Sequence, residues 1–160
     1  MEVQEHTLPA PEGLQRCARV LDVGAGIRPM QWYEPDLHLC LDPYQPYCDV
    51  LDKAGYMTTC MTALEGLQQL WRYGGHPAIG AIYLLDVLEH MPKELGKQVL
   101  TIAKKLAQVQ VVIYTPYGFK EQTKDVWEMG GDQWLVKNDD GLDMLRTGVA
   151  DMIPYLIHEE

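Results

Sequence analysis

The chain has 160 residues, of which 47% are hydrophobic and 22% charged, a composition that predicts one packed globular domain and excludes a disordered or fibrous protein. Its formal net charge of −10 at pH 7 makes nucleic acid an unlikely partner, because binding to a phosphate backbone relies largely on lysine and arginine. The chain has no apolar run of about 18 residues and does not open with a basic and then apolar leader, so we expect a cytoplasmic protein without membrane contact.

The hydrophobic pattern predicts strands that alternate with helices. In chain order, we expect a strand at 19–23, a strand at 37–42, a weaker strand at 56–61, a helix at 63–72, a strand at 78–85, a helix at 93–108 and a strand at 109–115. The segment 78–85 is nearly continuously apolar, as expected of a central strand, and 93–108 has apolar residues along one helical face. Residues 117–140 mix glycines and aspartates with tryptophans, which predicts a long loop.

This alternation of strands and helices favours an α/β fold with a mostly parallel central sheet. Parallel strands are joined by right-handed crossovers, which place helices on both faces of the sheet. We therefore expect a doubly wound, Rossmann-like three-layer sandwich. We interpret residues 1–160 as one domain with a core at about 19–116 and an irregular C-terminal segment at 117–160.

Two features fall where open parallel sheets bind ligands, beyond the carboxyl ends of the strands. Gly24 and Gly26 follow the first strand, where missing Cβ atoms let the backbone turn sharply and approach a ligand. Asp42 ends the second strand, where a carboxylate can accept hydrogen bonds from two ribose hydroxyls. A dinucleotide fingerprint would need a third glycine at the position of Pro29 and a longer helix before Leu37 to hold pyrophosphate. A ligand without phosphate therefore fits better than NAD or FAD.

The segments Val20–Gly26 and Leu85–Pro92, together with Asp42, resemble the motif set of class I S-adenosylmethionine-dependent methyltransferases. The resemblance covers roughly residues 19–116 and implies that S-adenosylmethionine is the cofactor. In that family the glycine turn contacts the methionine part and the acidic residue ending the second strand holds the ribose. The resemblance implies these site residues: for cofactor binding, Asp22, Gly24, Gly26, Asp42, Thr62 and Asp86, and for catalysis, His90 and Glu89.

The chain departs from the family pattern in three places. Thr62 occupies the position after the third strand where family members often carry an acidic residue that accepts from the adenine amino group. The pair Arg28 and Pro29 replaces the third small residue of the turn, so we expect a short or distorted first helix. The residues after Pro116 leave room only for a compressed version of the closing strands, which could be incomplete.

The segment around His90 predicts how a methyl acceptor would lose its proton. A neutral imidazole can accept a proton near pH 7, with Glu89 or Asp86 as an orienting carboxylate. Some methyltransferases bind a divalent metal through a similar acidic segment, but a full site would need another ligand, so we expect no metal. Each residue also has a structural interpretation: Asp22 could order the turn, and His90 could cap the following helix.

The sequence thus predicts an S-adenosylmethionine-dependent methyltransferase. Its acceptor would be a small molecule, since the net charge disfavours nucleic acid. One alternative is a noncatalytic module of methyltransferase-like fold that binds S-adenosylmethionine or S-adenosylhomocysteine. A purely structural α/β domain is a second alternative, disfavoured because the glycine turn and the carboxylate after the second strand are both present.

Overall fold

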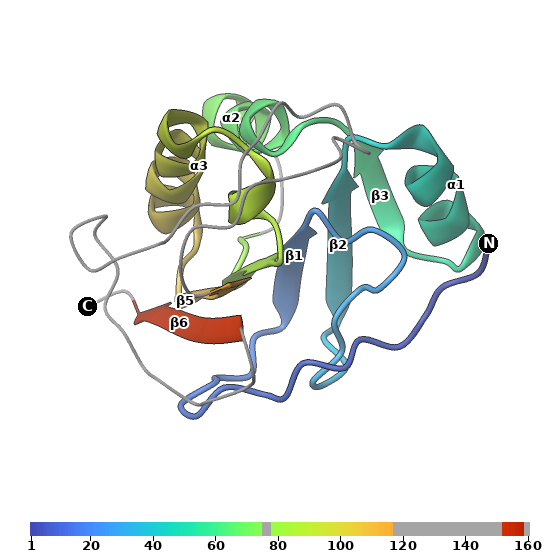
Figure 1. The fold of residues 1–160 in the computed structure, drawn as a ribbon, viewed down its shortest axis with the longest axis horizontal. Helices are drawn as coiled ribbons and strands as arrows, with labels where there is room; N and C mark the ends of the chain where they lie inside the picture. The colour runs from blue at the N-terminus through green and yellow to red at the C-terminus, as the bar shows by residue number, and fades with distance from the viewer. Residues whose placement is uncertain (75–77, 117–151, 159–160) are drawn as a thin grey trace.

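A six-stranded sheet in the order β3-β2-β1-β4-β5-β6 forms the centre of the computed structural model, which describes residues 1–74, 78–116 and 152–158 (Figure 1). The strands are β1 (Arg19–Val23), β2 (Leu37–Asp42), β3 (Met57–Cys60), β4 (Ala81–Leu85), β5 (Gln110–Pro116) and β6 (Met152–His158). The helices are α1 (Gln45–Lys53), α2 (Ala63–Tyr73) and α3 (Lys93–Leu106), with a single 3-10 turn η1 (Leu88–His90). Strands β1 to β5 are parallel and β6 is antiparallel to β5, so the predicted α/β fold with a mostly parallel sheet is confirmed.

Strand β1 lies between β2 and β4. From β1 the chain first adds β2 and β3 on one side and then β4 and β5 on the other, so the order of strands reverses at β1. Asp22 lies opposite Cys40 on β2 and Tyr83 on β4, so the carboxyl ends of the three strands are level. All five residues of β4 are buried, as its apolar sequence predicted. The connections that leave these strand ends diverge to opposite faces, which leaves a crevice between them.

The two faces of the sheet are covered differently. Helices α2 and α3 pack on one face, where Leu21 and Val23 of β1 point into the larger hydrophobic core (Figure 1). Helix α1 covers part of the other face, on which Leu51 packs against Cys40. The rest of that face is covered by irregular chain: Trp32, between β1 and β2, packs edge-on against Tyr83 with ring centroids 5.1 Å apart.

The N-terminal residues also lie against the sheet on the face opposite α2 and α3. Residues 3–11, called here the N-terminal strap, run beside the segment that follows β1. The Tyr114 hydroxyl donates to the Pro9 carbonyl at 2.6 Å, and the Trp32 indole N–H donates to the Leu8 carbonyl at 2.9 Å. These bonds hold a segment without regular secondary structure in a fixed place.

One expectation about helices is corrected, and one helix was not predicted. The expected short first helix is absent, because the described residues 24–36 form turns and bends, with Pro29 in the middle of a connection that has little room for a helix. Helix α1 was not predicted, although Pro46 in its first turn and the buried Cys48 and Leu51 mark a short helix.

The other predicted elements occur within a few residues of their expected ends. The strand expected at 78–85 begins at Ala81, and the helix expected at 93–108 ends at Leu106 because Ala107 adopts an extended conformation. Strand β6 supplies a closing strand. The loop expected at 117–140 lies outside the described residues.

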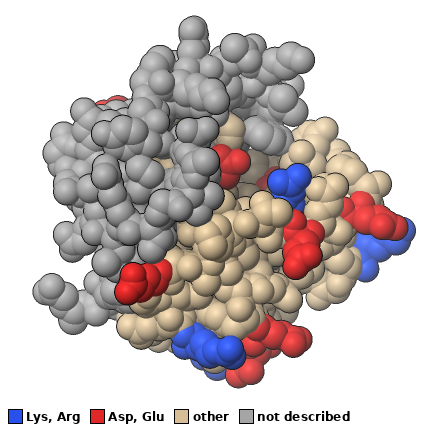
Figure 2. All heavy atoms as spheres, turned by 60° about the horizontal axis from the view of Figure 1, so that its bottom comes forward, with Lys and Arg blue, Asp and Glu red and all other residues tan. Residues whose placement is uncertain are grey.

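Two features bear on membrane and nucleic-acid contact: the length and polarity of the helices, and the distribution of charge on one face. Within the described ranges, every helix is too short or too polar to cross a membrane. On the face shown in Figure 2, lysine and arginine side chains of the described part occur in small separate groups beside acidic ones.

We predict that Gly66→Ala destabilises the fold, although alanine favours a helix over glycine by about 1 kcal/mol. A Cβ atom on Gly66 would lie 2.5 Å from Leu41 Cδ2 and 2.6 Å from Cδ1, so the buried Leu41 side chain would have to shift. Overpacking a core costs about 1–3 kcal/mol, so the net change should be a loss. Urea unfolding would measure it, with the exposed Gln69→Ala on the same helix as control. A higher unfolding midpoint for Gly66→Ala would contradict this packing.

Candidate functional site

A cleft opens at the carboxyl ends of β1, β2 and β4, where strand order reverses. It brings together four of the predicted site residues, Gly24, Gly26, Asp42 and Asp86, with the predicted base His90. Residues from four separate elements or loops thus meet at one place, as the fold argument predicted. The complete lining consists of Gly24, Gly26, Asp42, Pro43, Tyr47, Ala63, Asp86, Val87 and His90.

The glycine turn forms one wall of this cleft. Gly24 and Gly26 both adopt left-handed backbone conformations, with φ of 66° and 58°. A Cβ atom on Gly24 would lie 2.6 Å from Cγ2 of Val87 across the cleft, so a side chain would not fit there. The Gly24 N–H donates to the Leu41 carbonyl at 2.6 Å, which ties the start of the turn to β2. Glycine is therefore required at position 24 by both conformation and space.

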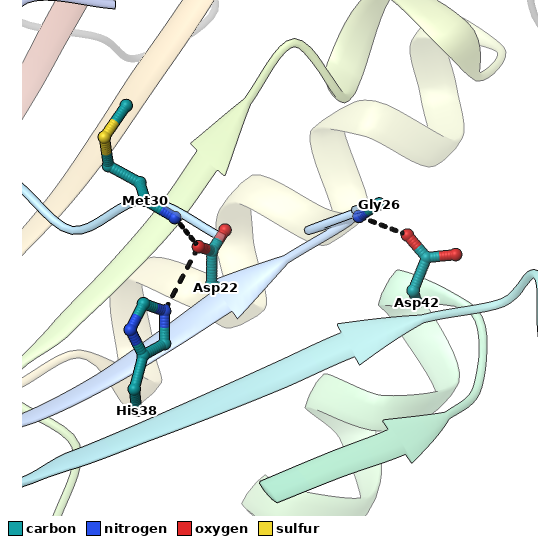
Figure 3. A network of polar contacts seen from close by, with 5 residues as sticks. All are labelled: Asp22, Gly26, Met30, His38 and Asp42. Carbon is teal, nitrogen blue, oxygen red and sulfur yellow. Dashed lines mark hydrogen bonds and ion pairs between the residues drawn. The ribbon is translucent and has the colours of Figure 1, made fainter. Parts of the chain in front are cut away.

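Asp42 ends β2 with its side chain buried at the bottom of the cleft, 4% exposed. One carboxylate oxygen accepts from the Gly26 N–H at 2.9 Å (Figure 3), and the other accepts from the Tyr44 N–H at 2.9 Å. Burial raises the pKa of this carboxyl above its usual value of 3.8, although the two N–H groups act in the opposite direction. Each oxygen keeps a further lone pair, so the carboxylate can accept from a ligand as well.

Asp22 is even more deeply buried, with 1% of its surface exposed, and its contacts lie within the protein. Its Oδ2 atom accepts from the Met30 N–H at 2.7 Å and lies 3.2 Å from Nε2 of His38 on β2 (Figure 3). These contacts fit the interpretation that Asp22 orders the turn. Asp22 is not among the residues that line the cleft, and its predicted direct role in cofactor binding stays a prediction.

Asp86 follows β4 in a left-handed conformation, with φ of 57°, which is uncommon for a residue other than glycine. Its N–H donates to the Tyr114 carbonyl on β5 at 2.9 Å, and this bond helps to hold the strained backbone. Strain of this kind costs about 1–3 kcal/mol and is concentrated at functional sites. His90, half-buried on η1, places Nε2 3.7 Å from Oδ1 of Asp86. Glu89 belongs to the same turn, but its side chain lies outside the described residues.

Thr62 has a structural role that its predicted contact with adenine did not include. Its hydroxyl caps helix α2 by accepting from the Glu65 N–H at 3.3 Å, and its side chain is exposed. The next residue, Ala63, lines the cleft instead. A contact between Thr62 and adenine stays a prediction.

Sequence reasoning missed the apolar wall of the cleft. Tyr47 enters from helix α1, and its ring packs edge-on against Tyr44 with centroids 4.7 Å apart. Pro43 and Val87 complete this wall beside Asp42. The proline at position 46, with the apolar Cys48 and Leu51, is the local signal that could have indicated the helix carrying Tyr47.

No protein-family model and no curated protein sequence matches the chain. The fold does match solved structures. The magnesium protoporphyrin IX methyltransferase from Synechocystis, crystallised with bound S-adenosylmethionine, gives a TM-score of 0.59 at 13% identity over 89% of this chain and 70% of that one. An O-methyltransferase family protein from Burkholderia thailandensis gives 0.59 at 13% identity over 88% and 50%, respectively. An rRNA methylase from Escherichia coli gives 0.56 at 15% identity over 89% and 57%.

These likenesses establish the fold. The chain has the fold of class I S-adenosylmethionine-dependent methyltransferases, as the motif resemblance implied. It spans between half and about 70% of the length of these three proteins. One is a magnesium protoporphyrin IX methyltransferase and another an rRNA methylase, so the fold by itself does not select an acceptor.

We predict that Gly24→Ala lowers the free energy of unfolding by about 2 kcal/mol or more. A left-handed conformation costs alanine about 1–2 kcal/mol, and the overlap with Val87 adds to it. Gly55→Ala is the matched control, because Gly55 has φ of 94° and open space around it. Urea unfolding should show a larger loss for Gly24→Ala than for Gly55→Ala. Equal losses would mean that the contact with Val87 does not exist.

Proposed function

We propose that this chain binds S-adenosylmethionine in the cleft and transfers its methyl group to a small-molecule acceptor. The main support is the buried carboxylate of Asp42, which ends β2 at the reversal of strand order and is held by the Gly26 N–H in the same cleft. A carboxylate in this position accepts from ribose hydroxyls in nucleoside-binding sheets of this type.

The residues around Asp42 fit an adenosine. Its two oxygens each accept one backbone N–H and have lone pairs left for the two ribose hydroxyls. The side chains of Pro43, Tyr47 and Val87 provide an apolar wall of the kind that purine rings pack against. The described residues 24–36 form turns and bends, so this segment offers no helix N-terminus of the kind that holds a pyrophosphate in dinucleotide sites.

The cofactor would supply an electrophilic methyl group on a sulfonium, and the protein would position the acceptor and remove its proton. We assign proton removal to His90, at the edge of the cleft. The Asp86 carboxylate, 3.7 Å from Nε2, stabilises the imidazolium that forms when His90 takes the proton. Glu89 is the second candidate for an orienting carboxylate.

The negative net charge of the chain favours a small-molecule acceptor over nucleic acid. The formal charge of −10 opposes the approach of a polyanion, and the basic groups visible in Figure 2 are interrupted by acidic side chains. An rRNA methylase from Escherichia coli has a similar fold, so the fold does not exclude an RNA acceptor. The preference for a small-molecule acceptor therefore rests on the negative charge of this chain.

A second candidate function is binding of S-adenosylmethionine or S-adenosylhomocysteine without methyl transfer. It is favoured by one observation: Asp42 and the glycine turn, which would bind the cofactor, are held within the protein independently of His90. Release of S-adenosylhomocysteine in the presence of hydroxylated, aminated and carboxylated acceptors would identify the enzyme. Tight binding without release in any acceptor mixture would favour the binding module.

We predict that S-adenosylhomocysteine raises the melting temperature, because a ligand bound only by the native state stabilises it by mass action, and that NAD does not. Asp42→Ala should weaken binding about tenfold or more, since hydrogen bonds to a charged group contribute about 1.5–3 kcal/mol. Thermal unfolding measures the first effect and isothermal titration calorimetry the second. Binding of NAD without binding of S-adenosylhomocysteine would refute the proposed function.

The pH dependence of the affinity tests whether the ionised carboxylate of Asp42 binds the ligand. Affinity should fall as acidification protonates Asp42, at a pH above the usual aspartate pKa of 3.8 because burial raises the pKa. A raised carboxyl pKa means that the folded chain binds this proton more tightly than the unfolded chain, so this protonation does not unfold the protein. In Asp42→Asn the acid step in affinity should disappear.

We predict that His90→Ala lowers the methyl-transfer rate about 100-fold or more while changing the affinity for S-adenosylhomocysteine less, because a general base acts on the acceptor. Single-turnover transfer and calorimetry on the same preparation would separate the two quantities. His38→Ala is not a suitable control, since His38 contacts Asp22. An unaltered transfer rate in His90→Ala would refute the assignment.

A further inference from the structure

A second hollow borders the same glycine turn and continues the cleft. It measures about 360 Å³ and shares Gly24, Gly26, Tyr47 and Asp86 with the cleft, whose enclosed volume is only about 70 Å³. Small-molecule sites in proteins usually measure about 300–1,000 Å³. A ligand that reaches Asp42 therefore extends past the glycine turn into the second hollow.

Polar side chains from distant parts of the sequence line this second hollow. Gln4 and His6 come from the N-terminal strap, Arg28 from the glycine turn and Asp86 from the end of β4. The Gln4 N–H donates to the Ile27 carbonyl at 2.7 Å, and Arg28 Nε donates to Oε1 of Gln4 at 3.2 Å. The strap and the turn are thus fixed to each other, with a cation and a carboxylate both on the lining.

His6 is half-buried and presents a hydrogen-bond donor. Its Nδ1 accepts from the Leu8 N–H at 3.4 Å, so the hydrogen of the neutral ring resides on Nε2. Burial lowers the pKa of His6, and the positive charge of Arg28 adds to this, while the carboxylates of Asp22 and Asp86 oppose it. His6 therefore remains neutral at pH 7 and donates through Nε2.

We propose that the N-terminal strap recognises the amino-acid end of the cofactor, with His6 and Arg28 donating to its α-carboxylate and Asp86 accepting from its α-ammonium group. The inference rests on the proposed function and assigns specificity to residues outside the sequence motifs. An α-amino acid carries an ammonium group and a carboxylate on the same carbon atom, and the second hollow is lined by the complementary pair, Arg28 and Asp86. A ligand bearing only negative charge would meet the Asp86 carboxylate.

The test compares two ligands that differ in this end alone. S-adenosylhomocysteine has the α-amino carboxylate, whereas 5′-methylthioadenosine has the same adenosine and thioether without it. Calorimetry on the full chain should show that His6→Ala and Arg28→Ala each weaken S-adenosylhomocysteine about tenfold, the usual effect of one hydrogen bond to a charged group. The affinity for 5′-methylthioadenosine should change less than about twofold on the same scale.

Two control variants keep the result specific. Arg72→Ala removes an exposed arginine at the end of α2, outside the residues that line the second hollow, and should affect neither ligand. His6→Gln retains an N–H donor and should recover part of the lost affinity. Equal losses for both ligands, or no loss in either variant, would overturn the role of the strap. If the unaltered chain bound neither ligand, the proposed function would fail and this inference with it.

Discussion

The carboxylate of Asp22 holds the connection between β1 and β2 in place without a helix. Its Oδ2 atom accepts the Met30 N–H and contacts His38, so a single buried group joins the end of β1, the middle of the connection and β2. This bond bends the chain back across the sheet, where Trp32 packs against Tyr83. The left-handed glycines at the start of the connection then face the end of β2. The shape of the cleft depends on this internal bond.

Asp22 and Asp42 lie at or next to the carboxyl ends of adjacent parallel strands, and both are buried, but they differ in their remaining hydrogen-bond partners. Asp22 is 1% exposed and bonds one oxygen to two partners within the protein. Asp42 is 4% exposed, lines the cleft and bonds each oxygen to one backbone N–H. Two N–H donors favour the ionised form while leaving lone pairs on the side of the ligand. The same residue type thus orders the turn at one strand end and can bind a ligand at the other.

Local patterns carried enough information to predict the sheet and the strand-end residues. The apolar run before Leu85 could only be a covered strand, and a glycine turn with Asp42 marked the ligand edge. Helix α1 was missed because its nine residues, with a proline near the start, are too few to show a recognisable helical repeat of apolar positions. The strap was missed for a different reason: its bond from Tyr114 to Pro9 joins residues 105 positions apart, which no local pattern records. The capping role of Thr62 was not predicted, because the capping bond depends on where α2 begins.

The missing first helix has a consequence for how a ligand would enter. In a sheet of this kind a helix after the glycine turn would pack on the face that the strap and residues 24–36 cover. The adenosine end of the proposed site is built on strand ends that are fixed by the sheet, including the buried Asp42. The other end is covered by a segment without regular structure, held through Gln4, Leu8 and Pro9 by single hydrogen bonds that each contribute about 1 kcal/mol. Local opening of such a segment requires less free energy than opening the sheet, so we expect the strap to open before the strand ends that carry Asp42.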